Sequence, residues 1–263
     1  MKNVRLLFFF LLIIGTELFL NSCSKDDSSN LGSKVSFYLT DAPSLQGYKA
    51  VNIDVQGVKY ILNDSSEISL PITPTVYNLL ELRNGKNTLL SNIILNEGEN
   101  IAQVRLILGD NNSVVLKDGT EVSIKTPSAQ TSGLKVNIQE NVTTSSGYSV
   151  MIDFDAERSI VRKGNGSYSL KPVIRGYVVE NTSAIYGNLL PKYEVFKVFT
   201  LVGSDTIVAV SDTTNNNYFM LHGLRTGNYT VSIQDPASLA ILKQMPVSVF
   251  GGTDVDMGTI EIK

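Results

Sequence analysis

The most regular feature of this sequence is the alternation of apolar and polar residues in short segments. In residues 51–58, Val51, Ile53 and Val55 are separated by polar side chains. Successive side chains of a β-strand point to opposite faces, so this period predicts a strand with one buried face. Comparable segments predict further strands at residues 35–39, 101–108, 113–116, 121–126, 134–138, 148–154 and 168–179.

Turn signals separate these segments. Asp118-Gly119 lies between two apolar runs and predicts a tight β-hairpin. The first strand is expected to stop at a turn over residues 40–43, and residues 77–83 and 156–160 to form single helical turns. Many short strands with regular turn signals are typical of a β-sandwich or barrel.

A second series of strand patterns follows a weak linker at residues 181–183. It covers residues 184–187, 193–202, 205–211, 218–221, 228–234 and 257–262. We therefore predict an all-β fold: two tandem β-sandwich domains, at residues 34–180 and 182–263, that follow a signal peptide and a short tether.

The N-terminal segment has the layout of a secretory signal. Lys2 and Arg5 precede an unbroken apolar run at residues 6–14, and a looser stretch with Glu17 leads to Ser22. A transmembrane helix is the alternative, but it needs about 20 predominantly apolar residues. The shorter run and its flanks favour a signal peptide over residues 1–22 that is removed after Ser22.

Cys23 is the only cysteine, so no disulfide forms within the chain. Leu20-Asn21-Ser22-Cys23 resembles the bacterial lipobox, although Asn21 is not the commonest residue at its place. The resemblance implies that Cys23 carries a diacylglyceryl group and an acylated amino terminus, with palmitate-type chains. Several acyl chains hold a protein firmly at a membrane, whereas one chain binds only marginally. The alternative is a secreted protein with an unmodified cysteine.

Residues 23–33 contain one large apolar residue, Leu31, and predict a flexible tether. Lys25-Asp26-Asp27 resembles the short export tag that follows the lipidated cysteine in Bacteroidota lipoproteins. This resemblance implies an outer-membrane lipoprotein displayed on the cell surface. An ordinary solvated linker has a similar composition.

The charge balance narrows the range of partners. Charged residues make up 18% of the chain and the net charge is -3. No basic footprint for nucleic acid is present, so the expected partners are a membrane, through the lipid, and a glycan or a surface protein.

Six motifs of the first domain occur in the order of one known family, at residues 35–43, 51–55, 105–108, 126–135, 153–156 and 170–175. With these motifs the domain resembles the family of domain of unknown function 4382. The resemblance implies a β-rich extracytoplasmic domain and brings no established activity.

In the second domain, Tyr218-Phe219 is followed by Gly223-Leu224, Gly227 and Tyr229. With this motif the domain resembles the carboxypeptidase regulatory-like, transthyretin-type sandwich, although Asn217 stands in place of a glycine. Asparagine tolerates positive φ, so the turn survives this change. The resemblance implies that the two glycines are turn residues and that Tyr229 anchors the core.

Some starch-binding modules share this carbohydrate-binding-like fold. The chain has no Trp for stacking on a sugar, but it has 11 Tyr. A zinc site needs at least three protein ligands. His222 is the only histidine, so we interpret it as a turn residue.

Asp153 and Asp155 are the candidate site residues. Two positions apart on a strand, their carboxylates project from one face, opposite Phe154. Such a pair binds Ca²⁺ or acts as a catalytic acid and base. The structural alternative is that they flank a buried Phe and pair with nearby cations: Arg158, Lys171 or Arg175. No other cofactor is expected.

Three functional hypotheses follow. The first is a lipid-anchored envelope protein with a binding, adhesive or structural role and no catalytic activity. The second is a carbohydrate-binding accessory lipoprotein for polysaccharide capture. The third is a hydrolase built on Asp153 and Asp155, which the single histidine disfavours.

Overall fold

The computed structural model describes residues 32–42, 47–126, 132–138 and 147–262. The leader, Ser22, Cys23 and the tether up to Leu31 lie outside the described residues. The described residues belong to one compact unit, Gly32–Lys263. Nearly all its regular elements are strands, which confirms the predicted all-β class. None of the helices among the described residues has the length and apolar character that a membrane span requires.

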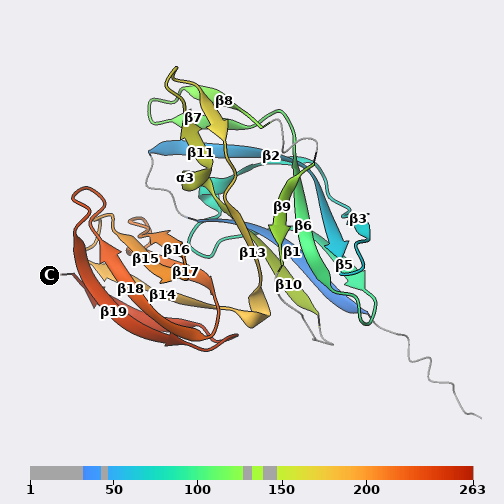
Figure 1. Ribbon diagram of the computed structural model, residues 1–263. Coiled ribbons are helices and arrows are strands. Elements are labelled where there is room, and N and C mark those ends of the chain that lie inside the picture. The colour runs from blue at the N-terminus through green and yellow to red at the C-terminus, as the bar shows by residue number, and fades with distance from the viewer. Residues whose placement is uncertain (1–31, 43–46, 127–131, 139–146, 263) are drawn as a thin grey trace, which may run out of the picture. The chain divides into compact units, whose positions relative to one another are not determined.

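Two sheets form the first sandwich (Figure 1). Sheet I has the order β13 (Ile174–Val178), β10 (Tyr148–Asp155), β1 (Ser33–Ala42) and β5 (Thr88–Leu95). Sheet II has the order β11 (Ile160–Arg162), β12 (Tyr168–Leu170), β8 (Glu121–Lys125), β7 (Ser113–Leu116), β2 (Tyr48–Leu62), β6 (Ile101–Leu108) and β9 (Leu134–Asn137). Strands β3 (Glu67–Ser69) and β4 (Thr75–Asn78) also pair with β2.

The alternating pattern explains the first core. Val35, Phe37 and Leu39 of β1 are fully buried, as are Ile152 and Phe154 of β10, and all five belong to one hydrophobic cluster. Burial of an aliphatic or aromatic side chain contributes about 1.5–3 kcal/mol, so this face holds sheet I against sheet II. Among the described residues of this part of the chain, three short segments are helical: η1 (Leu79–Glu81), α3 (Ala156–Ser159) and η2 (Val179–Asn181).

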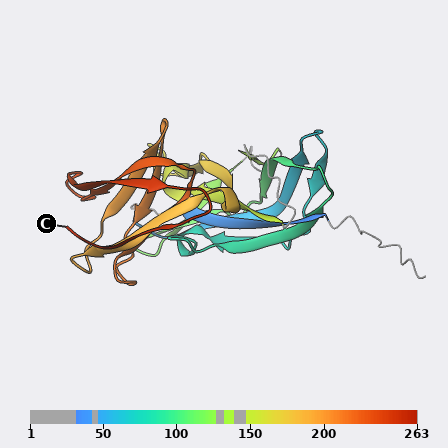
Figure 2. The ribbon, with the colours of Figure 1, turned by 90° about the horizontal axis from the view of Figure 1, so that it is seen from below.

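The second sandwich has its own hydrophobic cluster, which includes Ile185, Phe219, Leu221 and Val231. Sheet III has the order β17 (Tyr218–Leu224), β14 (Ser183–Leu190) and β20 (Val255–Glu261). Sheet IV has the order β16 (Asp205–Val210), β15 (Lys197–Val202), β18 (Gly227–Gln234) and β19 (Ile241–Val249). The two layers are seen from another side in Figure 2, in yellow to red. The domain boundaries at residues 180 and 182 stay predictions.

Several local predictions are confirmed. Strands β7 and β8 form an antiparallel hairpin, and Gly119 at its turn has a φ of 93°. Asn217 has a φ of 53°, so asparagine does take the positive-φ place of the glycine. Its buried amide donates to the carbonyls of Pro191 and Glu194, both at 2.9 Å. Tyr229 packs against the second core, half-buried, and its hydroxyl donates to the Arg225 carbonyl.

Three local predictions are wrong. Thr40 and Asp41 are not in a turn, because β1 continues in parallel register beside β10 to Ala42. The single strand expected at residues 168–179 is two strands, interrupted near Pro172, which has no backbone N–H for a sheet ladder. Gly223 lies within β17 and Gly227 begins β18, so neither is at the centre of the turn between these strands.

Candidate functional site

The described structure places a buried ion pair where the outer face of sheet I meets the second sandwich. Thr40, Asp153 and Arg175 stand in one row across three neighbouring strands, β1, β10 and β13. The Arg175 Nε donates to Asp153 Oδ2 at 2.6 Å, and the Asp153 side chain is only 2% exposed. The pair therefore lies in a setting where a lone charge would be costly.

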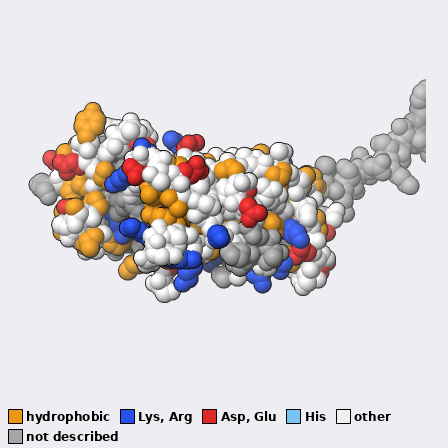
Figure 3. Space-filling model, turned by 90° about the horizontal axis from the view of Figure 1, so that it is seen from above, with side chains coloured by type: hydrophobic (Ala, Val, Ile, Leu, Met, Phe, Trp, Pro, Cys, Tyr) orange, Lys and Arg blue, Asp and Glu red, His pale blue; other side chains and the backbone are white. Residues whose placement is uncertain are grey.

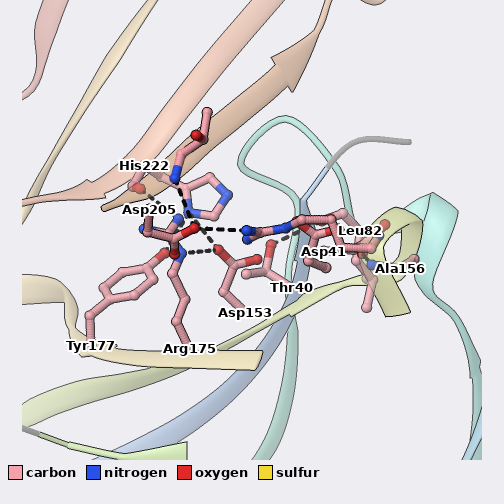
Figure 4. A network of polar contacts seen from close by, with 12 residues as sticks. Thr40, Asp41, Leu82, Asp153, Ala156, Arg175, Tyr177, Asp205 and His222 are labelled. Atoms are coloured by element: carbon pink, nitrogen blue, oxygen red, sulfur yellow. Dashed lines mark hydrogen bonds and ion pairs between the residues drawn. The ribbon is translucent and has the colours of Figure 1, made fainter. Parts of the chain in front are cut away.

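Arg175 also links the first sandwich to the second. Its Nη2 donates to the backbone carbonyl of His222 on β17 at 2.8 Å. Next to it, the Tyr177 hydroxyl and His222 Nδ1 are 2.6 Å apart, and the Arg175 guanidinium lies 5.3 Å from the centre of the Tyr177 ring. Figure 4 shows these side chains converging on Asp153.

A glycine makes this approach feasible. Gly223 has a φ of 70°, a left-handed conformation that costs other residues energy. A Cβ atom at this position would lie 2.8 Å from the Tyr177 ring. Both the backbone conformation and the close packing of the Tyr177 ring therefore require glycine next to His222.

Burial and neighbouring charges set the protonation of this group. Burial lowers the pKa of His222, Asp153 opposes that effect, and the net result is a pKa below the ordinary value. His222 is therefore neutral near pH 7. For Arg175, burial alone would lower the pKa, but the Asp153 carboxylate more than offsets it and the pKa is raised. Burial also raises the pKa of Tyr177, which stays protonated.

A second, more exposed set of ion pairs adjoins the first. Arg158 donates through Nε to Asp155 Oδ2 at 2.6 Å and through Nη1 to Asp205 of the second sandwich at 2.7 Å. Burial alone would raise the pKa of Asp205, but the hydrogen bonds from Arg158 and the Thr206 N–H, together with the nearby arginine charges, hold the pKa below its ordinary value. Asp155 also accepts from the Arg158 backbone N–H and so caps helix α3.

Asp41 is the most deeply buried acid near this contact. Its Oδ1 accepts from the Ala156 N–H at 2.9 Å, and its Oδ2 has no hydrogen-bond partner in the described structure. Burial raises the pKa of Asp41 well above its ordinary value, and the nearby Asp153 and Asp155 raise it further. Sequence reasoning missed this residue because it was assigned to a turn.

The predicted pair Asp153 and Asp155 flanks Phe154, which is fully buried. Of the three cations named for them, Arg175 pairs with Asp153 and Arg158 pairs with Asp155, while no ion pair joins Lys171 to either. In the described ranges, no three His, Cys, Asp or Glu side chains are grouped so that they would hold a metal ion. Calcium binding at this pair stays a prediction.

The assignment of His222 to a turn is wrong. It lies within β17, with Met220 two residues before it on the same side of the strand. Its partner Tyr177 is 45 residues away in sequence, so no local pattern links the two. The available signal was the spacing of Arg175 and Tyr177, which are two residues apart on β13. This spacing shows that both side chains lie on one face of the strand, but it does not identify their partners.

The fold and this contact define an all-β protein in which two sandwiches meet through buried polar side chains. The chain belongs to the family described as "Domain of unknown function (DUF4382)", which matches residues 32–172 and confirms the resemblance seen in the sequence. No curated protein sequence matches the chain.

The comparison with solved structures finds bacterial proteins of low identity and low TM-score. The Bacillus anthracis TIE protein is 9% identical, with a TM-score of 0.24, and the match covers 88% of this chain and 34% of that one. The major pilin subunit BcpA of Bacillus cereus is 11% identical, with a TM-score of 0.23 and coverage of 88% and 69%. The fimbrial anchor protein of Porphyromonas gingivalis is 9% identical, with a TM-score of 0.19 and coverage of 81% and 82%. The chain thus spans about a third of the length of the first of these proteins.

Proposed function

We propose that this protein is a lipid-anchored, non-catalytic protein of the cell envelope that presents its two sandwiches as one rigid structural or adhesive element. The main observation behind the proposal is that the charged residues at the contact pair with one another. Asp153 and Asp155, the best candidates for chemistry, each hold an arginine of the same chain. A catalytic acid or base must instead face its substrate within hydrogen-bond reach.

The contacts support a rigid link. Arg175 and Arg158 each bridge from the first sandwich to the second, and Asn84 adds a hydrogen bond from its Nδ2 to the Val210 carbonyl at 3.1 Å. These three side chains come from separate segments of the first sandwich, and each has a hydrogen-bond partner in the second. Such a network resists relative movement of the two sandwiches, because movement would leave buried polar groups unpaired.

The proposed anchor is a lipid on Cys23 after removal of residues 1–22. A fully extended chain spans at most about 3.3–3.6 Å per residue, so the segment from Cys23 to Gly32 reaches about 30 Å. The compact unit would be held close to the membrane surface. Residues 25–27 favour export to the outer face of the outer membrane.

Fractionation of cells that produce the full chain tests this anchor. The unchanged protein is expected in the membrane fraction and to incorporate a palmitate analogue. Cys23→Ala is expected to lose both properties, whereas the neighbouring substitution Ser24→Ala keeps them. Retention of label and membrane binding by Cys23→Ala would refute the lipid anchor. Resistance of the intact-cell protein to added protease would refute surface display.

Polysaccharide capture is the second candidate function, and one exposed aromatic favours it. Tyr193 in the second sandwich is 82% exposed, with a φ of 67°. Its backbone N–H donates to Asn217 Oδ1, so the buried asparagine fixes the loop that presents this ring. A glycan array on the full chain, compared with Tyr193→Ala, tests this candidate. Polysaccharide capture predicts a glycan signal for the unchanged chain that Tyr193→Ala removes.

A further inference from the structure

A cleft of about 150 Å³ lies beside the ion-paired contact, between the outer faces of sheets I and III. Met151 and Tyr177 line it from sheet I, and Ala184, Met220 and His222 line it from sheet III. These five side chains present mainly apolar surface. An apolar cavity of about 150 Å³ in another protein binds benzene, so the space suits one small ring.

His222 supplies a polar atom on the sheet III side of this cleft. Its Nδ1 lies 2.6 Å from the Tyr177 hydroxyl, and its Nε2 has no protein partner in the described chain. The Tyr177 hydroxyl proton has one acceptor within reach among the described residues, which is Nδ1. The hydroxyl therefore donates to Nδ1, and the neutral ring carries its own proton on Nε2. The Nε2–H of His222 is thus a donor that faces the cleft, beside the side-chain amide of Asn87.

The other hydroxyl groups of the lining are already engaged with the backbone. Thr40 donates to the Leu82 and Lys86 carbonyls, Thr182 donates to the Val178 carbonyl, and Ser183 donates to the Phe250 carbonyl. Asp254 accepts from the Ala184 N–H at 2.7 Å and is exposed. The exposed Asn87 amide donates to the Gly85 carbonyl at 3.4 Å. A sugar ring needs several hydrogen bonds to replace its water, and among the five side chains from sheets I and III only His222 offers one.

We propose that this cleft binds a small, mainly apolar ring compound, of the phenol or cyclic alcohol class, whose oxygen accepts a hydrogen bond from His222 Nε2. The ring fills the space between Met151, Tyr177 and Met220. Its oxygen pairs with the His222 donor. This site is separate from the membrane anchor and goes beyond the proposed structural role.

The single histidine makes the test direct. The full chain with Cys23→Ala, labelled with ¹⁵N-histidine, gives signals from one imidazole. We expect the free protein to show the tautomer with the proton on Nε2. Phenol should shift the Nε2 signal in a saturable way, and toluene, which has no oxygen, should bind about three- to tenfold more weakly, the effect of one hydrogen bond.

Two comparisons complete the experiment. Ala184→Leu places a larger side chain in the cleft and should abolish the phenol-induced shift, while Tyr193→Ala, on an exposed loop, should leave it unchanged. If Ala184→Leu does not fold, the comparison of phenol with toluene on the protein with an unchanged cleft still tests the proposal. Equal binding of phenol and toluene, no shift with phenol, or a larger shift with methyl glucoside would each overturn the proposal.

Discussion

Asp153 and Arg175 stand directly opposite each other on neighbouring antiparallel strands, and the same arginine reaches the backbone of His222 in the second sandwich. This relationship makes one ion pair part of both the first sandwich and its contact with the second. The arginine neutralises a carboxylate that is almost fully buried, and its Nη2 donates across the contact.

Removal of one partner of this pair should be strongly destabilising. Arg175→Ala leaves the Asp153 charge buried and unpaired, and we expect a loss of about 3–5 kcal/mol in the free energy of unfolding. Replacement of both partners by Asp153→Leu with Arg175→Met should cost much less, because no uncompensated charge remains. Urea denaturation measures both values.

The exposed pair of Lys59 and Glu67 is the matched control, with side chains 38% and 34% exposed. Lys59→Ala should cost at most about 1 kcal/mol. If Arg175→Ala cost no more than this control, the buried pair would not stabilise the protein.

Asp41 should give an unusual dependence of stability on pH. Its pKa is raised in the folded protein, so its favourable contribution is complete below the ordinary value of 3.8 and is lost as the pH rises through the folded pKa. At neutral pH the buried charge is therefore unfavourable. Asp41→Asn removes that charge and should raise the melting temperature at pH 7 by about 2–4 °C, which corresponds to 1 kcal/mol.

Asp205 gives the opposite control. Its folded pKa is lowered, so its contribution is present above 3.8 and is lost as the pH falls through the folded pKa. Asp205→Asn should therefore destabilise at pH 7, and both substitutions should have little effect at the acid end of the range. A stabilising effect of Asp41→Asn that grows as the pH is lowered would contradict this assignment.

Gly223→Ala should disturb the contact through the Tyr177 ring. The substitution combines a φ of 70° with a Cβ position 2.8 Å from that ring. Gly258→Ala is a matched control, because Gly258 has a φ of 64° and open space around the added atom. The backbone alone costs about 1–2 kcal/mol in each. We expect thermal unfolding to show a clearly larger loss for Gly223→Ala, and equal losses would mean that Tyr177 moves aside freely.

Chelation tests the calcium interpretation of Asp153 and Asp155. Both carboxylates have arginine partners at 2.6 Å, so a cation would have to displace Arg175 and Arg158. We expect the melting temperature to be the same with EDTA, with added Ca²⁺ and with Mg²⁺. A rise in the melting temperature with Ca²⁺ alone, reversed by EDTA, would support calcium binding by this pair.

The strands with clear alternation could be predicted from sequence to within a few residues. Residues 101–108 form β6 as predicted, because buried and half-buried positions alternate from Val104 to Leu108. Strand β19 could not be predicted in this way. It is an exposed edge strand that contains Pro246, and a proline inside a pattern argues against a strand unless the strand lies at an edge.

Some features of the candidate site could likewise be predicted from the sequence, and others could not. The common face of Asp153 and Asp155 and the pairing of Asp155 with Arg158 follow from spacing along the chain, whereas Arg175 reaches Asp153 through the pairing of β13 with β10. The contact of Tyr177 with His222 does not follow from spacing either, because it depends on how two separately formed sheets pack. Asp41 was hidden for a different reason: the sequence Thr40-Asp41-Ala42-Pro43 is typical of a turn, whereas parallel pairing with β10 keeps it extended.

On the face shown in Figure 3, acidic and basic side chains are interspersed among polar and hydrophobic ones. Exposed hydrophobic residues are suitable sites for spin labels, because their replacement by cysteine removes no charge from this surface. Leu89 of β5 is 46% exposed and Leu201 of β15 is 64% exposed, one in each sandwich.

The most direct test of a rigid link between the sandwiches is the distance distribution between spin labels at Leu89→Cys and Leu201→Cys, in the full chain with Cys23→Ala. We predict one narrow distribution when the contact is intact, and a broad one after Arg175→Ala. A broad distribution with the contact residues unchanged would contradict the account.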